Sequence, residues 1–573
     1  MNDFGSKIYA AAQKAVKEVY DLDVAEGQLV VETPQDTKLG DYSTSIAMKL
    51  SRTLRRNPME IAEPLVAKLA ELLPECESIT VARPGFINFK LKASALTAVI
   101  NDVITAGDDY GKNESGKGKH LLLEWVSANP TGDLHCGHAR NAAWGDCIAR
   151  MMEASGWDVL REFYVNDAGN QIEKFAKSLE ARYLQIIKGE DAVEFPEDGY
   201  HGDDIRELAR AFYDREGEKY LDCDQKTRHD ALARFGLDNN IPKMQRDLAR
   251  YGITYDQWFF ESSLHESGYV ADSVQALTDL GYTYEKDGAL WLNTSRILAE
   301  NLKKAGKSDA DIEKLGLKDD VLRRANGFYT YFAADIAYHR NKFAVRGFDK
   351  VINVWGADHH GHVARLKGAM DALGLDGEHR LDIVLMQLVK LVRDGQVVRM
   401  SKRTGKAISL TDLLDEIPVD ACRYFFNAKP ETQMEFDLGL AVREDSENPV
   451  YYVQYAHARI CTLLKALEAE GYTVPAAGEV DFSLLSGEAE QALIKKIAAY
   501  SQVVRLAARD YDPSHINRYL TELAGDFHRF YTACRIKGEE RPVLLARLKL
   551  ADTARSVLKN AMTLIGCTAP EKM

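Results

Sequence analysis

A short apolar run, a loop rich in turn-forming residues and a long alanine-rich segment follow one another in residues 121–152. The apolar run LLLEWV predicts a buried strand, and Asn129 and Pro130 end it, because a residue before proline is disfavoured in the helical region. The alanine-rich segment predicts a helix that begins near His138. His135 and His138 would meet at its N-terminus, where free backbone N–H groups and the helix dipole favour an anion. This stretch therefore predicts a strand whose following loop holds a phosphate group.

Further strand-like runs alternate with helical segments beyond this stretch. The runs are WDVLREFYVND, GFYTYFAAD, KVINVWG and LDIVLMQLVKLV, at residues 157–167, 327–335, 350–356 and 381–392. Strands separated by helices are typical of a parallel sheet with right-handed crossovers. We therefore expect an interrupted α/β core with insertions near 171–245 and 269–322. The second insertion contains a predicted hairpin, YTYEKDGALWLN, with Asp287 and Gly288 at its turn.

The chain of 573 residues is too long for one hydrophobic core. Helical periodicity at 4–20 and 60–73, with two β-like runs at 79–91, predicts a separate α+β module that a polar linker at 106–120 closes. From about residue 445 onward the pattern is nearly all helical. We expect four parts: an α+β module at 1–118, the α/β core at 119–394, a basic loop and the segment after it at 395–444, and a helix bundle at 445–573.

Composition indicates where the protein works and what it can bind. No run of eighteen apolar residues occurs, and the N-terminal amphipathic segment lacks the apolar stretch of a secretory signal. The eight cysteines show no CxxC pair, which argues against a disulfide framework or a thiolate zinc site and favours the reducing cytoplasm. The net charge of −14 argues against nucleic acid. Binding depends on local charge, however, and residues 501–573 carry 12 Lys and Arg against 8 Asp and Glu.

Two more segments carry side chains suited to chemistry. The loop VVRMSKRTGKAISL at 397–410 is basic and comes after a predicted hairpin turn at Asp394 and Gly395. Taken alone, a lysine-rich loop is usually a solvated turn, and an HxxH pair is usually structural. The segment DHHGH offers metal donors, but consecutive residues rarely converge on one ion without distant partners. Its donors are Asp358, His359, His360 and His362.

The order of these motifs closely resembles the class I aminoacyl-tRNA synthetases, in which HIGH follows the first strand of the core and KMSKS follows the last. HCGH matches the first motif, and Met400, Ser401 and Lys402 fit the second, whereas Arg399 and Arg403 replace its first lysine and last serine. The flanking segments resemble the arginyl-tRNA synthetases over nearly the whole chain. They are SANPTGDLHCGHARNAAWGD, REFYVNDAGNQI, YTYFAADIAYHRNKF, VWGADHHGH, ENPVYYVQYAHARI and CTAPEKM.

The resemblance, to the bacterial type of this family, implies a fold and an activity. The fold is a Rossmann-like parallel-sheet core with an α+β N-terminal module that contacts tRNA, a stem-contact region at 395–444 and an all-helical anticodon-binding domain. The activity joins arginine and ATP into arginyl-adenylate and pyrophosphate, and then transfers arginine to the 3′-terminal adenosine of tRNA. Mg²⁺ is expected with ATP, although no dedicated carboxylate cage is visible. The expected partners are tRNA, L-arginine and ATP, with no membrane, and monomers are the family habit.

The expected ATP site combines this resemblance with the chemistry of the reaction. In-line attack on a phosphate needs positioning and charge neutralisation more than acid–base chemistry. His135 and His138 are suited to donate hydrogen bonds to phosphate, and Lys402 supplies a positive charge for pyrophosphate. These three are the expected catalytic residues. The expected ATP-binding residues are Ala128, Asn129, Pro130, Thr131, Gly132, Leu134, His135, Gly137, His138, Met400, Ser401 and Lys402.

An arginine substrate demands acidic acceptors, because the fixed N–H donors of guanidinium match a carboxylate in pairs. Glu124 ends the first strand and Asp335 follows another apolar run, so both are well placed. Without the resemblance, the alternative for Glu124 is a surface carboxylate at a strand end. The resemblance implies that Tyr331 and Asp335 hold the guanidinium with help from Glu124. The other implied arginine-binding residues, at the α-amino and carboxylate end, are Ser127, Asn129 and His359.

The expected contacts with tRNA rest on the two outer parts of the chain. Tyr452 and Arg459 belong to the polar and aromatic segment NPVYYVQYAHAR, where the core joins the helix bundle. Aromatic side chains of this kind can stack on splayed bases. Arg52 and Arg55 could meet the tRNA backbone, and a solvated helix face explains them equally well.

Two alternatives stay open. Another class I synthetase, such as the cysteinyl type, normally holds a zinc ion through cysteines, and the absence of paired cysteines counts against it. A non-catalytic tRNA-binding relative would keep the fold without the reaction. The intact HCGH motif and Lys402 argue against that alternative.

Overall fold

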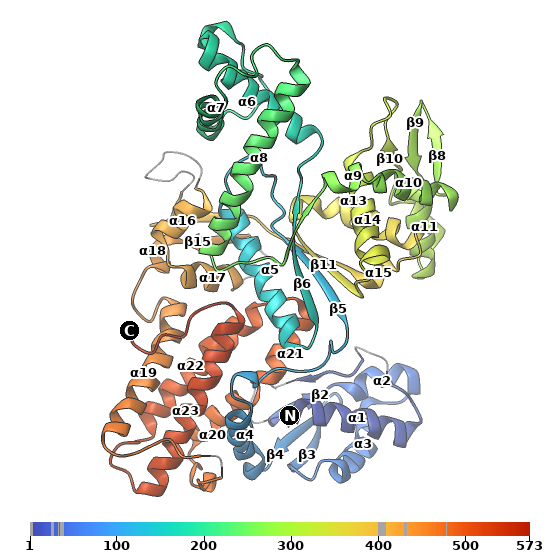
Figure 1. The fold of residues 1–573 in the computed structure, drawn as a ribbon. Coiled ribbons are helices and arrows are strands. Elements are labelled where there is room, and N and C mark those ends of the chain that lie inside the picture. Colours follow the sequence, from blue (N-terminus) through green and yellow to red (C-terminus); the bar gives the residue numbers. More distant parts are fainter. Residues whose placement is uncertain are drawn as a thin grey trace. The chain divides into compact units, whose positions relative to one another are not determined.

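A computed structural model describes residues 4–24, 28–32, 34, 39–398, 408–428, 433–476 and 478–573 (Figure 1). The chain forms two compact units. One unit joins the two ends of the chain, residues 1–113 and 443–573, and the other contains residues 114–442. No helix among the described residues is long and apolar enough to span a membrane. All eight cysteines are free.

The first unit contains an α+β layer and a helix bundle. Its antiparallel sheet has the order β1-β2-β4-β3, with strands Val31–Glu32, Tyr42–Thr44, Phe86–Leu91 and Cys76–Ala82 in that order. The helices of this layer are α1 Phe4–Tyr20, α2 Ile46–Leu54, α3 Pro58–Leu72 and α4 Ala93–Ala106. The bundle consists of α19 Pro449–Ala469, α20 Glu488–Ala498, α21 Tyr500–Asp510, α22 Ser514–Ala533 and α23 Arg541–Leu564.

The helix bundle packs directly on the N-terminal layer within this unit. Helix α4 lies against α20 and α23. The ring of Tyr110 stacks on that of Tyr500 at 6.0 Å, and the side chain of Asn560 donates to the carbonyl of Gly107 at 2.9 Å. Such aromatic and buried amide contacts join the two ends of the chain into one packed body.

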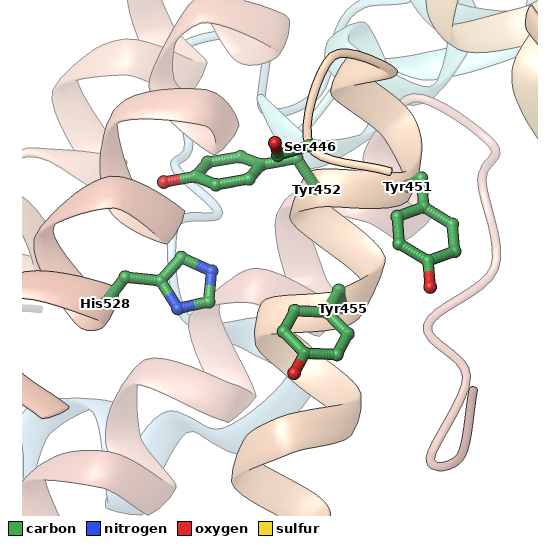
Figure 2. A pocket seen from close by; sticks show the side chains of 5 residues that line it. All are labelled: Ser446, Tyr451, Tyr452, Tyr455 and His528. Atoms are coloured by element: carbon green, nitrogen blue, oxygen red, sulfur yellow. The ribbon is translucent and has the colours of Figure 1, made fainter. Parts of the chain in front are cut away.

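An aromatic cavity of about 450 Å³ lies between α19 and α22 of the bundle (Figure 2). Tyr452 and Tyr455 come from one helix and His528 comes from the other, with ring centroids 5.1 and 6.1 Å from the histidine. The full lining is Ser446, Tyr451, Tyr452, Tyr455 and His528. Burial, helped by the charge of Arg459, lowers the pKa of His528, so that this wall of the cavity is an uncharged ring near neutral pH.

The second unit is built on a five-stranded parallel sheet of order β12-β11-β5-β6-β7. Its strands are β5 His120–Trp125, β6 Asp158–Val165, β7 Gln257–Phe260, β11 Lys350–Gly356 and β12 Leu381–Met386. Residues 121–123 are fully buried, as expected for a strand that helices cover on both faces. The connecting helices include α5 Cys136–Ala154, α13 Tyr331–Arg340, α14 His360–Ala372 and α15 Gly377–Arg380. The predicted α/β core with a Rossmann-like parallel sheet is confirmed.

The strand predicted at 327–335 is wrong, because helix α13 begins within it. The hydroxyl group of Thr330 accepts from the backbone N–H of Ala333 and caps the helix. Phe332, Ala333, Ile336 and Ala337 are then buried at helical spacing. The aromatic and β-branched residues before the cap imitate a strand, whereas the cap and the spacing after it decide the structure.

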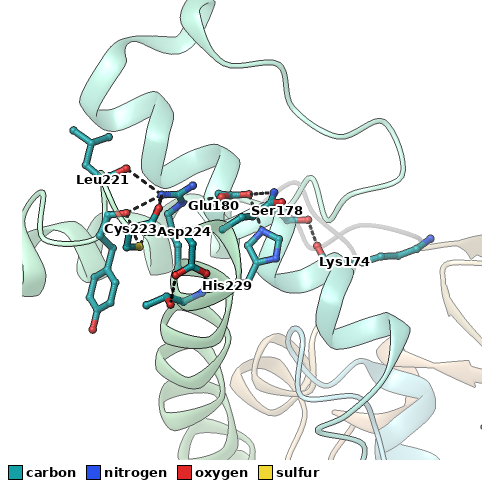
Figure 3. A network of polar contacts seen from close by, with 11 residues as sticks. Lys174, Ser178, Glu180, Leu221, Cys223, Asp224 and His229 are labelled. Carbon is teal, nitrogen blue, oxygen red and sulfur yellow. Dashed lines mark hydrogen bonds and ion pairs between the residues drawn. The ribbon is translucent and has the colours of Figure 1, made fainter. Parts of the chain in front are cut away.

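The first insertion is a helical subdomain with its own core, formed by α6 Asn170–Lys188, α7 Asp203–Glu216 and α8 Gln225–Arg250. A polar network ties α6 to the start of α8 (Figure 3). Glu180 accepts from Arg228 Nε and from His229 Nε2, both at 2.7 Å. Arg228 also donates to three backbone carbonyls of the preceding loop, those of Tyr220, Leu221 and Cys223. The guanidinium group of Arg228 thus links α6, the start of α8 and the loop before α8.

The second insertion contains an antiparallel sheet of order β10-β9-β8. The predicted hairpin is confirmed, because β8 Thr283–Lys286 and β9 Ala289–Leu292 pair around Asp287 and Gly288, whose φ angles are 53° and 75°. The other elements are α9 Ser262–Glu266, α10 Tyr269–Asp279, α11 Thr294–Lys304, α12 Asp309–Glu313 and β10 Asp320–Arg323.

A small sheet of order β14-β13-β15 completes the second unit. The turn predicted at Asp394 and Gly395 is confirmed, because β13 and β14 pair antiparallel across it. The elements of this region are β13 Val389–Arg393, β14 Gln396–Val397, α16 Leu410–Glu416, α17 Val419–Asn427, β15 Met434–Asp437 and α18 Leu438–Ala441.

Candidate active site

The strand order places a topological switch beside β5. The chain runs from β5 to β6 and β7 on one side, and then continues with β11 and β12 on the other side. At such a switch the connections leave in opposite directions, which opens a crevice at the carboxyl ends of the two central strands. The loop after β5 carries His135 and leads into α5, and DHHGH follows β11. The topology therefore brings both motifs to one edge of the sheet.

His135 and His138 form a stacked pair at the start of α5, with ring centroids 3.7 Å apart. The backbone N–H of His135 donates to Nδ1 of His138, and the N–H of Gly137 donates to Nδ1 of His135, both at 3.1 Å. Because each Nδ1 is an acceptor, each neutral ring carries its proton on Nε2. Two Nε2–H donors therefore stand side by side at the helix N-terminus, as the phosphate hypothesis requires.

Both imidazoles are held in the neutral form. Burial lowers the pKa of His135, and burial together with the neighbouring His135 lowers the pKa of His138 to about 3. The space beside this pair requires glycine at position 137, because a Cβ there would lie 2.9 Å from Cε1 of His135. The pair is a fixed hydrogen-bond donor for an anion and changes no proton of its own near neutral pH.

Two consecutive left-handed residues turn the chain at the end of β5. Val126 has a φ of 66° and Ser127 a φ of 39°. This conformation is rare for a β-branched residue and is found mainly where function requires it. Val126 is held by its N–H, which donates to the side chain of Asn141 at 2.7 Å. The turn points the hydroxyl group of Ser127 back toward the strand end, where it donates to Oε1 of Glu124 at 2.9 Å.

The predicted nucleotide loop is largely buried by its neighbours. Asn129 is exposed, whereas the side chains of four other predicted residues are buried, namely Ala128, Pro130, Thr131 and Leu134. Helix α8 binds this loop through two contacts. Asn240 donates to the carbonyl of Pro130 at 2.9 Å, and Lys243 pairs with Asp133. Asp204, at the start of α7, lies 3.6 Å from the position of a Cβ on Gly132.

The second predicted nucleotide motif lies within residues 399–407, outside the described part of the chain. Met400, Ser401 and Lys402 lie outside the described residues. The chain that follows them returns to the first motif, since His135 forms a β-bridge with Ser409 and the N–H of Leu410 donates to the carbonyl of Leu134 at 2.7 Å. Ser409 and Leu410 are therefore anchored to the loop that carries the first motif.

The charges of three carboxylates act on the side chain of Tyr164. Burial, reinforced by the negative charges of Glu261, Asp335 and Glu124, raises the pKa of Tyr164 well above 10. Glu124 and Glu261 are only 5% and 3% exposed. Such a concentration of buried acid favours a cationic ligand. Glu261 was not among the residues predicted from the sequence, and its only sequence signal is its position directly after the short strand β7.

A buried lysine, also missed from the sequence, accompanies this acidic group. Nζ of Lys342 lies 2.6 Å from Oε2 of Glu124 and 3.3 Å from Oδ1 of Asn353. It also lies 3.9 Å from the centre of the Tyr338 ring. Burial lowers the pKa of Lys342, and the charges of Glu124 and Glu162 act in the opposite direction. Glu124 is thus already paired with a cation inside the protein.

Asp335 is held by a different histidine of DHHGH from the one predicted to bind substrate. Nε2 of His362 lies 2.9 Å from the carboxylate of Asp335, and Arg365 lies 3.3 Å from Nδ1 of the same ring. Asp358, His359 and His360 are exposed and do not converge with His362. Across the described ranges, no three His, Cys, Asp or Glu side chains gather as a metal site.

The remaining predicted residues lie at the rim of the site or in the other unit. The predicted guanidinium ligand Tyr331 is 45% exposed, and its ring lies 3.5 Å from the position of a Cβ on Gly169. In the first unit, Tyr452 lines the aromatic cavity and Arg459 lies over the ring of Tyr531 at 4.1 Å. Arg52 and Arg55 are exposed at the end of α2.

Comparison with known proteins identifies the class first. Three family models match consecutive segments: "Arginyl tRNA synthetase N terminal domain" at 6–91, "tRNA synthetases class I (R), catalytic domain" at 99–437 and "DALR anticodon binding domain" at 453–573. With a parallel sheet and an imidazole pair at its switch point, the fold and the matched catalytic domain define a class I aminoacyl-tRNA synthetase.

Relatives in curated collections are similar over the full chain. An arginine–tRNA ligase of Ruminiclostridium cellulolyticum is 48% identical over 100% of both chains, and one of Caldanaerobacter subterraneus subsp. tengcongensis is 50% identical over 95% of this chain and 93% of that protein. The chain belongs to the arginyl-tRNA synthetase family, so the resemblance seen in the sequence is confirmed. The solved arginyl-tRNA synthetase of Thermus thermophilus shares the fold, with a TM-score of 0.78 at 21% identity over 99% of this chain and 100% of that one.

Proposed function

We propose that this protein is an arginine–tRNA ligase, which activates L-arginine with ATP and transfers it to the 3′-terminal adenosine of its tRNA. The observation that carries the proposal is the position of the acidic group. The negative charges of Glu124, Asp335 and Glu261 all act on Tyr164. Glu124 and Glu261 lie at the carboxyl ends of β5 and β7, and the loop after β5 holds the imidazole pair. A cation-binding site and a phosphate-binding site thus share one strand end, as adenylate formation from arginine requires.

The imidazole pair binds the phosphates of ATP. The carboxylate of arginine attacks the α-phosphate, and negative charge grows on the phosphate oxygens as pyrophosphate leaves. The Nε2–H groups of His135 and His138 donate hydrogen bonds to that charge, because their tautomer is fixed before the ligand arrives. Lys402 adds a positive charge near pyrophosphate. Mg²⁺, brought in with the nucleotide, would neutralise part of the phosphate charge.

The acidic group selects the side chain of arginine. Guanidinium presents paired N–H donors, and Asp335 and Glu261 supply acceptors with Tyr331 at the rim. Glu124 adds negative charge from beneath. Ser127, Asn129 and His359 lie toward the α-amino and carboxylate end of the amino acid. His362 occupies one oxygen of Asp335, and an uncharged amino acid would displace water from the other oxygen without supplying a donor, which makes this pocket selective.

The first unit recognises tRNA. The cavity between α19 and α22 presents Tyr452, Tyr455 and the uncharged ring of His528, a set of flat surfaces on which an unstacked base can lie. Arg459 stands on the same helix α19, and Arg52 and Arg55 meet the phosphate backbone. We expect the protein to work as a cytoplasmic monomer.

Exchange of pyrophosphate into ATP tests this function. The exchange is measured with each of the twenty amino acids, with and without tRNA, followed by charging of purified tRNA. Among the twenty amino acids, only arginine should support exchange and charging. Exchange driven by a different amino acid would refute the substrate assignment. Absence of both exchange and charging would instead favour a tRNA-binding relative without catalysis.

A further inference from the structure

The structure assigns Lys342 as a positioning residue that, through Glu124, fixes the hydroxyl proton of Ser127 and leaves the Ser127 oxygen as an acceptor for the α-ammonium group of the substrate. The inference rests on arginine being the substrate. It changes the part that Glu124 plays, because Glu124 then serves the amino end of arginine through Ser127 and the guanidinium is left to Asp335 and Glu261.

Lys342 stands where an ion pair needs a special reason. Its side chain is fully buried, and a buried ion pair seldom stabilises a fold more than well-packed apolar residues would. The residue belongs to a π-helical turn, Asn341–Val345, that directly continues α13. Such turns are rare and often occur at functional sites. Here the turn brings the ammonium group under the end of β5, one and two helical turns beyond Tyr338 and Asp335.

The ammonium group of Lys342 has no freedom left. It carries three N–H donors, and three partners surround it: Glu124 at 2.6 Å, Asn353 at 3.3 Å and the face of the Tyr338 ring at 3.9 Å. Its charge is therefore balanced by groups inside the protein. It acts on the substrate only through the groups it holds.

Glu124 is committed by both of its oxygens. Oε2 receives the ammonium group of Lys342, and Oε1 receives the hydroxyl group of Ser127 at 2.9 Å. With both oxygens already bonded inside the protein, this carboxylate is poorly placed to pair with a guanidinium in two parallel hydrogen bonds. Asp335 has a side chain that is 34% exposed, so it is the more accessible acid.

The hydroxyl group of Ser127 therefore has a defined direction. It donates its one proton to Glu124 and accepts from the backbone N–H of Tyr164 at 3.1 Å. A hydroxyl oxygen has two lone pairs, so one remains for a ligand. This oxygen can accept from an ammonium group and cannot donate to a carboxylate. It distinguishes the two charged groups on the α-carbon of an amino acid and sets the orientation of arginine.

The same lysine reaches the guanidinium end by a second route. Asn353 bonds Nε2 of His339 at 2.7 Å, and Nδ1 of that ring lies 2.8 Å from the backbone carbonyl of Asp335. Burial lowers the pKa of His339 well below 6.5, so the ring stays neutral and donates from Nδ1. Lys342 is thus linked to the backbone of Asp335 by a second chain of buried hydrogen bonds.

Removing both charges of the pair tests the inference without leaving a buried charge alone. The double variant Glu124→Gln/Lys342→Met keeps the approximate volume of both side chains. Two ligands are compared by equilibrium binding: arginine, and 5-guanidinopentanoate, which lacks only the α-amino group. We expect arginine to bind about 10- to 150-fold more weakly, the range for a lost hydrogen bond to a charged group, and 5-guanidinopentanoate to bind within threefold of its wild-type affinity. The kcat for exchange at saturating arginine should change less than KM.

Two further variants make the result decisive. Glu490→Gln/Arg547→Met removes a comparable ion pair of 2.7 Å in the helix bundle and should leave the ratio of the two affinities unchanged. Ser127→Ala keeps Lys342 and Glu124 in place and should reproduce the selective loss of arginine even where the double variant folds poorly. Equal weakening of both ligands in Ser127→Ala or in the double variant would overturn the inference. Failure of the wild-type protein to use arginine would refute the proposed function instead, so the two failures are distinct.

Discussion

The substitution Asp335→Asn removes one negative charge from the proposed guanidinium site and keeps the shape of the side chain. The carboxylate of Asp335 is bonded to Nε2 of His362 at 2.9 Å, and an amide oxygen can still accept that hydrogen bond. The amide nitrogen then faces the ligand. It is a donor, and guanidinium offers only donors, so the contact is lost and nothing replaces it.

The size of the loss follows from the geometry. One oxygen of Asp335 is occupied by His362, so guanidinium can gain one direct hydrogen bond to a charged acceptor at this residue, worth about 1.5–3 kcal/mol. With 1.4 kcal/mol per factor of ten, the KM for arginine should rise about 10- to 150-fold. The side chain is 34% exposed, and solvent screening moves the expectation toward the lower half of this range.

The assay is pyrophosphate exchange at varied arginine and saturating ATP, with the melting temperature measured in parallel. The KM for ATP and the melting temperature should stay close to their wild-type values. Asp319→Asn is the matched control, because Asp319 bonds Ser295 and Tyr284 in the second insertion, away from the carboxylate group. A KM for arginine that is unchanged in Asp335→Asn, within threefold, would remove Asp335 from the guanidinium site.

Three other predictions concern the nucleotide loops and tRNA. Lys402→Ala should slow adenylate formation by about 100-fold or more while arginine binding stays nearly unchanged, because a charge aimed at the leaving group acts mainly in the transition state. Stopped-flow kinetics measures the rate and equilibrium binding measures the affinity. Equal losses of rate and affinity would mean that the lysine contributes to ground-state binding only. The free energy of unfolding should fall as pH drops from 6.5 toward 3. In this range the unfolded chain binds a proton at His138, whereas the folded chain, in which His138 has a pKa of about 3, does not. Urea titrations at pH 7, 6 and 5 should show a smaller fall for His138→Gln, and an identical fall would contradict the assignment. Tyr452→Ala should weaken tRNA binding about 5- to 100-fold by removing one stacking surface, and arginine-dependent exchange in saturating tRNA should stay unchanged. Filter binding measures the Kd for tRNA, with Tyr9→Phe as a control. An unaltered Kd would exclude a base from the cavity.

Motifs formed by neighbouring residues were predictable because their contacts are local. The start of α5 near His138 and the turns at Asp287–Gly288 and Asp394–Gly395 involve hydrogen bonds between residues only a few positions apart. Their sequence signals therefore contain most of the interactions that form them. The segment 327–335 shows the limit, since its aromatic residues suit a strand and a helix equally, and packing of α13 decided between them.

The sequence by itself determined the family, the α/β core and the imidazole pair at the start of α5. Only the tertiary structure decided how the acids of the site are employed. Glu124 meets Lys342 across 218 positions of chain, and Glu261 reaches the same site from the end of β7. His362, rather than His359, bonds Asp335. These pairings depend on the order of strands in the sheet and on burial, which sets the strength of each charge, and neither can be read from spacing along the chain.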